Sequence, residues 1–244
     1  MISAVALIPA RGGSKRVLKK NTRLLAGAPL ITYTINTAKL SGIFDQIIVS
    51  TDDEATAEIA IKYGATVPEL RPSKFATDSS PDIEWVSYAA ENWLSNSEVN
   101  LVILRPTSPL RKPQTIKNAH EIFCQNAWAD SLRAMQPVAE HPGKMWRIGE
   151  GEEATPFIDQ LQRPVPTHSS PTNTLEEVWV QNASLEIVKS STVTGKKTLA
   201  GDRVLKYEMP GLEGYDINSE KDWAYLEFLI KSNPTLLSAA DLRN

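Results

Sequence analysis

Apolar-rich runs alternate with amphipathic stretches along the first half of the chain. The runs at 4–8, 46–50 and 101–104 are typical of strands that are buried on both faces of a sheet. Each is followed by a stretch in which apolar residues recur at helical spacing. Strands that alternate with helices of this length predict βαβ units. We therefore expect a doubly wound, Rossmann-like α/β fold with a mostly parallel sheet.

Residues typical of helix ends mark the limits of these helices. Pro29 opens the first predicted helix and Gly42 ends it, since proline suits the first turn and glycine the C-terminal cap. Ser80 is predicted as the N-cap of a helix that runs to about Trp93. The sequence at 219–222, Ser-Glu-Lys-Asp, is a capping-box pattern before the last long helix.

The region 137–177 differs in character from the rest of the chain. It is rich in proline, has little regular periodicity, and is followed by another apolar-rich strand at 178–188. We interpret it as an excursion inserted into a single domain that spans 1–244, not as a domain of its own. Its apolar side chains at 145–146 and 157–158 need burial, and an irregular lid packed on its own subunit would provide it.

Composition narrows the classes of function. The 244 residues carry a net charge of −3, which favours binding neither to nucleic acid nor to a membrane surface. No apolar stretch approaches the roughly 20 residues that cross a bilayer, and the first residues do not resemble a signal peptide. The single cysteine excludes an internal disulfide and gives no metal-site spacing. We expect a cytoplasmic protein.

The loop that follows the first strand carries the candidate chemistry. Glycine backbone can approach a ligand closely and adopt positive φ, so several N–H groups can converge on a phosphate. Arg11 and Lys15 add positive charge. The spacing matches neither the P-loop nor the dinucleotide fingerprint, and a solvated basic turn is the alternative. The candidate phosphate-binding residues are Ala10, Arg11, Gly12, Gly13, Ser14 and Lys15.

Five motifs in order relate the chain to a known family. Pro-Ala-Arg-Gly-Gly-Ser-Lys-Arg at 9–16, followed by Lys-Asn at 20–21, resembles the signature of cytidylyltransferases that make CMP-activated nonulosonic acids. This family includes the CMP-sialic acid synthetases and their legionaminic and pseudaminic relatives. The further matches are Ser-Thr-Asp at 50–52, Leu-Arg-Pro at 70–72, Pro-Thr-Ser-Pro-Leu-Arg at 106–111 and Tyr-Asp-Ile-Asn at 215–218.

The resemblance implies a fold of the nucleotide-diphospho-sugar transferase type and a reaction between CTP and a small acidic sugar. The products would be a CMP-sugar acid and pyrophosphate. Arg11, Lys15 and Asp216 would be the catalytic residues, and Lys20 would either face phosphate or be solvated. Beyond the phosphate-binding residues, the nucleotide would be bound by Asn21, Arg71, Ser79 and Ser80.

The resemblance also implies Mg²⁺ as the cofactor, because this cation binds one or two carboxylates together with phosphate oxygens. Asp216 is the first candidate ligand. Asn218 is the second, and it stands where the family usually has an aspartate; an amide oxygen can bind the cation, but it carries less charge. In the alternative interpretation, Asp216 only favours the dipole of the helix that follows it.

The sugar pocket is predicted from the same resemblance, which implies contacts from Arg105, Ser108, Lys144, Arg163, Asn182 and Glu186. Family members use the region 137–177 to pair subunits, so we expect a homodimer in which Arg163 reaches either its own or the partner's pocket. Three positions depart from the sialic acid enzymes, which have glutamine at 105, arginine at 180 and tyrosine at 186. Arg105 could replace the missing arginine as a carboxylate ligand. Alternatively, the acceptor is not N-acetylneuraminate itself, and Glu186 favours a donor-rich or amino-bearing sugar acid.

Two other functions fit the same residues. A related nucleotidyltransferase could load a different sugar acid or a sugar phosphate. A non-catalytic nucleotide-binding protein could keep the fold, although the presence of Arg11, Lys15 and Asp216 argues against it.

Overall fold

The computed structural model describes residues 3–94, 98–158 and 164–237. The chain forms two compact units: the first comprises Met1–Ala134 and Asn182–Asn244, and the second comprises Met135–Gln181. The predicted excursion at 137–177 lies within the second unit. Among the described residues, no helix is both long and apolar enough to span a bilayer.

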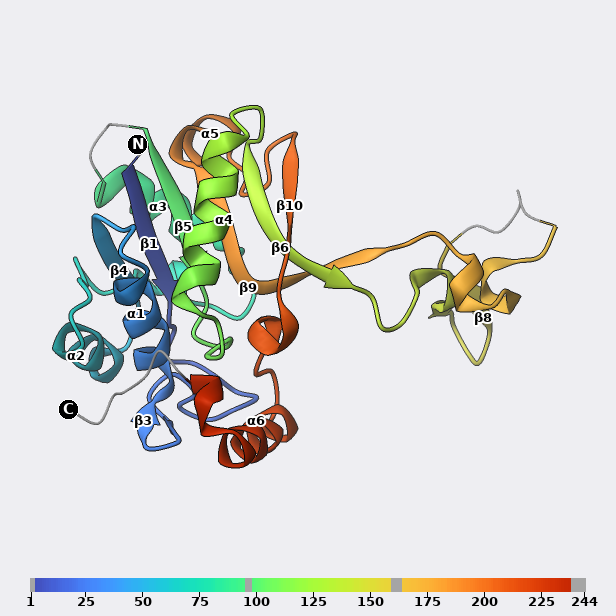
Figure 1. Cartoon of the computed structure of the whole chain (residues 1–244), viewed down its shortest axis with the longest axis horizontal. Helices are drawn as coiled ribbons and strands as arrows, with labels where there is room; N and C mark the ends of the chain where they lie inside the picture. The colour runs from blue at the N-terminus through green and yellow to red at the C-terminus, as the bar shows by residue number, and fades with distance from the viewer. Residues whose placement is uncertain (1–2, 95–97, 159–163, 238–244) are drawn as a thin grey trace. The chain divides into compact units, whose positions relative to one another are not determined.

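The strands and helices follow one another in the order shown in Figure 1. The strands are β1 (Ser3–Pro9), β2 (Leu24–Leu25), β3 (Ala28–Pro29), β4 (Gln46–Ser50), β5 (Val99–Leu104), β6 (Ser131–Pro137), β7 (Trp146–Ile148), β8 (Ala154–Pro156), β9 (Trp179–Lys189) and β10 (Val204–Glu208). The α-helices are α1 (Leu30–Ser41), α2 (Glu54–Lys62), α3 (Asp82–Asn92), α4 (Pro113–Gln125), α5 (Ser190–Lys196) and α6 (Glu220–Ser232).

Within the described residues, the central sheet has six strands in the order β10-β6-β9-β5-β1-β4. β1 pairs in parallel with both β4 and β5, whereas β9 runs antiparallel to β5. The chain passes from β1 to β4 on one side and then to β5 on the other, so the strand order reverses beside β1. The predicted mostly parallel α/β fold is confirmed, and ligands bind at such a reversal in folds of this kind.

Helices cover both faces of this sheet, as the alternating side chains of β1 require (Figure 1). Ala6 and Ile8 point into a core that α1, α2 and α4 close. Val5 and Leu7 point into the opposite core, which α3 and α5 close. The near-continuous apolar character of the predicted strand therefore reflects burial on both sides.

Most helix limits agree with the capping signals in the sequence. Gly42 is the left-handed C-cap of α1, with φ of 67°, and Ser219 forms the predicted capping box with Asp222 at the start of α6. The prediction of Ser80 as an N-cap was wrong. α3 begins one residue later, after Pro81, because the Ser80 hydroxyl donates to the Lys74 carbonyl instead.

The last third of the first unit returns to the loop that follows β5. α6 packs a third apolar core, including Trp223 and Leu226, against residues near the N-terminus of α1. The Ile217 N–H donates to the Thr107 carbonyl at 2.9 Å. This hydrogen bond joins the motif at 215–218 to the motif at 106–111.

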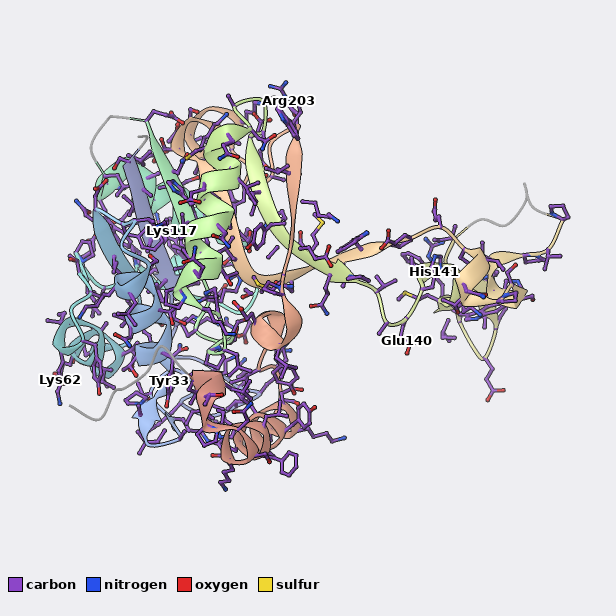
Figure 2. All side chains as sticks on the ribbon, viewed as in Figure 1. Tyr33, Lys62, Lys117, Glu140, His141 and Arg203 are labelled. Atoms are coloured by element: carbon purple, nitrogen blue, oxygen red, sulfur yellow. The ribbon has the colours of Figure 1, made fainter. Side chains whose placement is uncertain are left out.

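The second unit contains the β7–β8 hairpin and short helical turns. His141, labelled in Figure 2, is buried, and its Nδ1 accepts a hydrogen bond from the Gly143 N–H. The Thr167 hydroxyl donates to the Gly143 carbonyl at 3.0 Å. The unit thus has polar contacts of its own, while several of its large apolar side chains remain exposed.

Candidate active site

A pocket of about 600 Å³ lies in the first unit, beyond the carboxyl end of β1. It is lined by residues from every motif quoted above except 50–52, and also by Asp78, Asp82 and Trp85. The predicted site residues that line it are Arg11, Ser14, Lys15, Asn21, Arg71, Ser80, Arg105, Asp216 and Asn218. The structure therefore brings Arg11 and Asp216 to one pocket, although 205 positions separate them in the sequence (216 minus 11).

The loop that leaves β1, which we call the glycine loop (residues 9–16), is held against the end of β4. The Gly12 N–H donates to the Asp52 carboxylate at 2.9 Å. A Cβ on Gly12 would lie 2.8 Å from the Asp53 Cβ, so glycine is needed there for close packing. Neither Gly12 nor Gly13 has positive φ, so the expected use of positive φ was wrong. Gly13 has open space around its Cα.

Two of the three cations of the glycine loop, Arg11 and Lys15, are paired with one carboxylate, and the third, Arg16, also lines the pocket. Arg11 Nη1 lies 2.8 Å from Asp78 Oδ1, and Lys15 Nζ lies 2.5 Å from Asp78 Oδ2. Arg11 also donates to the Thr77 carbonyl. The hydrogen bond from Lys15 is the main reason that the pKa of Asp78 lies below its ordinary value. The cationic side of the pocket can therefore hold an anionic group, and in this state it holds Asp78.

The base of the pocket is formed by Arg71 and Asn21, which are both buried. Arg71 donates from Nε to the Ser50 hydroxyl and from Nη2 to the Ser50 carbonyl, and it lies over the Trp85 ring at 4.8 Å. Burial lowers the pKa of Arg71 to about 10, although Asp52 opposes this shift. The guanidinium is still charged at neutral pH. Asn21 is held by a hydrogen bond from its amide nitrogen to the Arg11 carbonyl.

Asp216 also lines the pocket, and one of its oxygens has no hydrogen-bond partner among the described residues. Asp216 Oδ2 accepts from Asn218 at 2.6 Å, whereas the buried Oδ1 makes no hydrogen bond with any described residue. A buried carboxylate oxygen without a partner fits a hard cation, and Asn218 adds an amide oxygen beside it. Burial lowers the pKa of the nearby Lys20, against the opposing charge of Asp216. Lys20 lines the pocket and donates to the Ile217 carbonyl.

Arg105 lines the pocket as part of a charged network. Its Nη2 donates to Asp82 at 2.7 Å and to Glu186 at 2.9 Å. The other oxygen of Glu186 accepts from Arg133. Burial alone raises the pKa of Asp82, but the Arg105 charge and the hydrogen bonds from Arg105 and Trp85 hold that pKa below its ordinary value. Burial, and then the charge of Arg105, lower the pKa of Arg133.

Of the other predicted site residues in the described part of the first unit, none lines the pocket. Ala10 and Ser79 lie next in the chain to Arg11 and Ser80, which do. Ser108 is fully buried, and its hydroxyl makes no hydrogen bond within the described part of the chain. Glu186 is buried behind Arg105, and the Asn182 side chain accepts from the Ser184 N–H. Lys144 belongs to the second unit, and Arg163 lies outside the described residues.

Sequence reasoning missed Asp78, Asp82 and Trp85. Asp78 lies in an irregular loop in which no spacing distinguishes a functional carboxylate. In the sequence, Asp82 is an acidic residue in the first turn of a predicted helix, and the helix dipole alone explains an acidic residue at such a position. Trp85 reads as part of the apolar face of α3, and its ring does lie in that core. Its indole nitrogen nevertheless donates to Asp82 at the pocket.

Comparison with known proteins identifies the family of this chain. The family model for cytidylyltransferases matches residues 5–148, which include the glycine loop, Arg71 and Arg105. A CMP-N,N'-diacetyllegionaminic acid synthase from Legionella pneumophila is 33% identical over 237 residues, covering 96% of this chain and 98% of that protein. A pseudaminic acid cytidylyltransferase from Campylobacter jejuni is 40% identical over 124 residues, covering 50% of this chain and 53% of that protein. An N-acylneuraminate cytidylyltransferase from Streptococcus agalactiae is 29% identical over 226 residues, covering 91% of this chain and 52% of that protein.

Solved structures show the same fold at low sequence identity. A CMP:2-keto-3-deoxy-manno-octonic acid synthetase complexed with CTP superposes with a TM-score of 0.68 at 13% identity, covering 94% of this chain and 99% of that one. A 4-diphosphocytidyl-2C-methyl-D-erythritol synthase from Anaerococcus prevotii superposes with a TM-score of 0.65 at 11% identity, with the same coverage. From the family match and the near full-length relative, the chain belongs to the cytidylyltransferase family.

Proposed function

We propose that this enzyme transfers the cytidylyl group of CTP to the anomeric hydroxyl of a nonulosonic acid. The hydroxyl oxygen attacks the α-phosphorus and loses its proton, the bond from that phosphorus to the bridging oxygen breaks, and pyrophosphate leaves. Such a transfer needs positioning and charge stabilisation more than covalent chemistry by the protein. The observation that carries the proposal is the common pocket of Arg11, Lys15 and Asp216.

The cationic wall suits the triphosphate. Arg11 and Lys15 already bind a carboxylate with both of its oxygens, and phosphate oxygens present a similar but more highly charged target. Exchange of Asp78 for the triphosphate would leave both cations paired. Lys20 lines the same pocket and adds a further positive charge to it.

Arg71 and Asn21 suit the cytosine. Both lie in the buried base of the pocket, where the hydrogen bonds to Ser50 and to the Arg11 carbonyl fix their orientation. An asparagine amide can donate and accept at once, as recognition of a pyrimidine edge requires. The backbone near Ser79 and Ser80 is the third element of this subsite in our proposal.

Asp216, with Asn218 beside it, would hold Mg²⁺. The cation would neutralise charge that develops on the phosphate oxygens during transfer. In this proposal the protein supplies Asp216 Oδ1, which has no hydrogen-bond partner among the described residues, in the same pocket as the glycine loop. The hydrogen bond from Ile217 to the Thr107 carbonyl fixes the backbone next to this carboxylate.

The proposal that the acceptor is a sugar acid has two supports, the names of the relatives and the presence of Arg105 in the pocket. The relatives are named for legionaminic, pseudaminic and N-acylneuraminic acids, which are sugar acids. Arg105 lines the pocket, and a guanidinium there supports the proposal because it pairs well with a carboxylate. We propose a nonulosonic acid of this group as the acceptor.

We also propose that the enzyme is a homodimer paired through the second unit. The exposed large apolar side chains of this unit include Met145, Trp146, Ile148, Phe157 and Val165. Burial of such a group of side chains is the main driving force of most protein association. The Arg163 contribution to a pocket, its own or the partner's, is part of this proposal.

The test is pyrophosphate release by the purified enzyme, measured with four nucleotides and a panel of acceptors. We expect release with CTP and a nonulosonic acid in the presence of Mg²⁺, and its near loss in Arg11→Ala and Lys15→Ala. A Lys197→Ala variant is the control, since Lys197 pairs with Glu91 outside the pocket. Release with a sugar phosphate or an octulosonic acid alone would support a different acceptor. Absence of release with every acceptor, despite CTP binding, would support a non-catalytic protein.

A further inference from the structure

We propose that Glu186, together with Arg133, is a positioning residue for Arg105, and that Arg105 is specificity-determining because it donates to an oxygen atom of the acceptor. The inference rests on the proposed function and refines the acceptor class of the same pocket. It predicts selection for a sugar acid that presents a carbonyl or carboxylate oxygen to Arg105. A free ammonium group at that point would be rejected.

Glu186 is not available to the sugar. Its side chain is 6% exposed, and its two oxygens accept from different arginines, Arg105 and Arg133. A buried carboxylate between two guanidiniums is fully compensated. The idea that Glu186 attracts an amino-bearing sugar therefore conflicts with the geometry, because an ammonium would have to displace a partly buried arginine from a buried carboxylate.

Arg105, in contrast, reaches the pocket. Its two hydrogen bonds to Asp82 and Glu186 both use Nη2. Its Nε and Nη1 donate to no residue that the structure describes, so these N–H groups are the ones left for a ligand. A guanidinium held at one corner is pre-organised, which reduces the ordering cost of each new hydrogen bond.

The charge of Arg105 determines whether the enzyme favours an acceptor with an ammonium group or one with an oxygen atom at this point. Arg105 presents positive charge on the wall, and its partners Asp82 and Glu186 lie on the Nη2 side. An acceptor ammonium facing Nη1 would meet like charge in a partly buried place, where screening by water is weak. An acyl carbonyl or a carboxylate would accept a charge-assisted hydrogen bond instead.

Glu186→Gln tests the positioning role. Glutamine keeps the size but removes the charge that holds two arginines, so Arg105 loses its fixed direction. We expect the KM for the acceptor to rise about tenfold, the magnitude of one charge-assisted hydrogen bond, while the KM for CTP stays within about twofold. Glu91→Gln is the matched control, because Glu91 forms an exposed ion pair with Lys197 outside the pocket.

A matched pair of acceptors tests the specificity role. The pair is one N-acylated nonulosonic acid and the same acid after removal of its acyl groups. We expect kcat/KM of the wild-type enzyme to favour the acylated acid by about tenfold or more, and Arg105→Gln to reduce this ratio toward one. If Glu186 acts through Arg105, then adding Glu186→Gln to Arg105→Gln causes little further loss.

Three outcomes would overturn the inference. They are equal or better use of the deacylated acid by the wild type, a loss in Glu186→Gln confined to that acid, and full additivity of the two changes. Where Glu186→Gln does not fold, Glu186→Asp and the selectivity of Arg105→Gln still decide the question. Lack of turnover with either acid, with CTP bound, would instead count against the proposed function.

Discussion

The Arg11 guanidinium and the Asp78 carboxylate form an ion pair of 2.8 Å, and both residues line the pocket beyond β1. Lys15 binds the other oxygen of the same carboxylate. Anionic ligands that use these cations must therefore replace an internal carboxylate. The Asp78 carboxylate is ionised at neutral pH, and its contacts with Lys15 and Arg11 lower its pKa further below the ordinary value.

Asp78→Asn removes this internal competitor. We expect CTP to bind severalfold more tightly in the absence of divalent metal, because Arg11 and Lys15 no longer have to break two ion pairs. Isothermal titration calorimetry without metal measures the effect. Asp202→Asn is the control, since Asp202 pairs with Lys196 outside the pocket. Unchanged or weaker binding in Asp78→Asn would contradict the competition.

Asp216→Ala separates a metal role from a structural one. The variant loses the unpaired Oδ1, so we expect Mg²⁺-dependent turnover to fall by about a hundredfold or more, in line with loss of a metal ligand or its support. Binding of CTP without metal should change little. Equal loss in turnover and in metal-free binding would show that Asp216 mainly supports the fold.

Asn218→Asp adds a second carboxylate beside Asp216. The two side chains are already 2.6 Å apart through a hydrogen bond, and two carboxylates attract a divalent cation more strongly than one. We expect half-maximal activity at a lower Mg²⁺ concentration. A titration of turnover against Mg²⁺ measures the shift. A higher requirement for Mg²⁺ would argue that Asn218 does not face the cation.

Asp130 makes stability depend on acid pH. It accepts hydrogen bonds from Lys196 and from the backbone of Asp202 and Arg203, which lower its pKa from the ordinary 3.8 to about 2. A depressed carboxyl pKa adds stability above the unfolded value, and this stability is lost as the pH falls from near 4 through about 2. We expect Asp130→Asn to lower Tm at neutral pH, with the difference from wild type shrinking below pH 4. Thermal unfolding across this range tests it, and a constant difference would contradict the linkage.

The proposed homodimer depends on the apolar face of the second unit. Ile148 is 70% exposed, and a charged side chain at an apolar interface would have to be buried without a partner. We expect Ile148→Glu to shift the protein from dimer to monomer in analytical ultracentrifugation. Phe228→Glu, on an exposed position of α6, is the matched control. A monomeric wild type, or a dimer that tolerates Ile148→Glu, would contradict the proposal.

The parallel core of the fold could be predicted from sequence because burial on both faces leaves a clear trace. The apolar runs at 4–8 and 101–104 became β1 and β5, and Gly42 ended α1 as glycine does at a C-cap. The first residue of a helix was harder to predict. Ser80 had a side chain suited to capping, but a nearby carbonyl competed for its hydroxyl.

The candidate site could be predicted only where motifs marked it. Arg11 and Asp216 were found through local patterns near opposite ends of the chain, and the fold brings both to one pocket. The ion pair of Glu186 with Arg133 joins positions 53 apart, and no spacing rule links them. Asp78 was missed because its role depends on Arg11 and Lys15, and only the fold brings these two cations next to the loop that carries it.

The hydrogen bond from the Ile217 N–H to the Thr107 carbonyl is made entirely by main chain. If Arg105 selects the acceptor as proposed, its replacement would alter which sugar is accepted while the carboxylate of Asp216 keeps its place. Because this hydrogen bond does not depend on side chains, enzymes descended from one ancestor could come to accept different sugars while the residues proposed to bind the nucleotide stay in place.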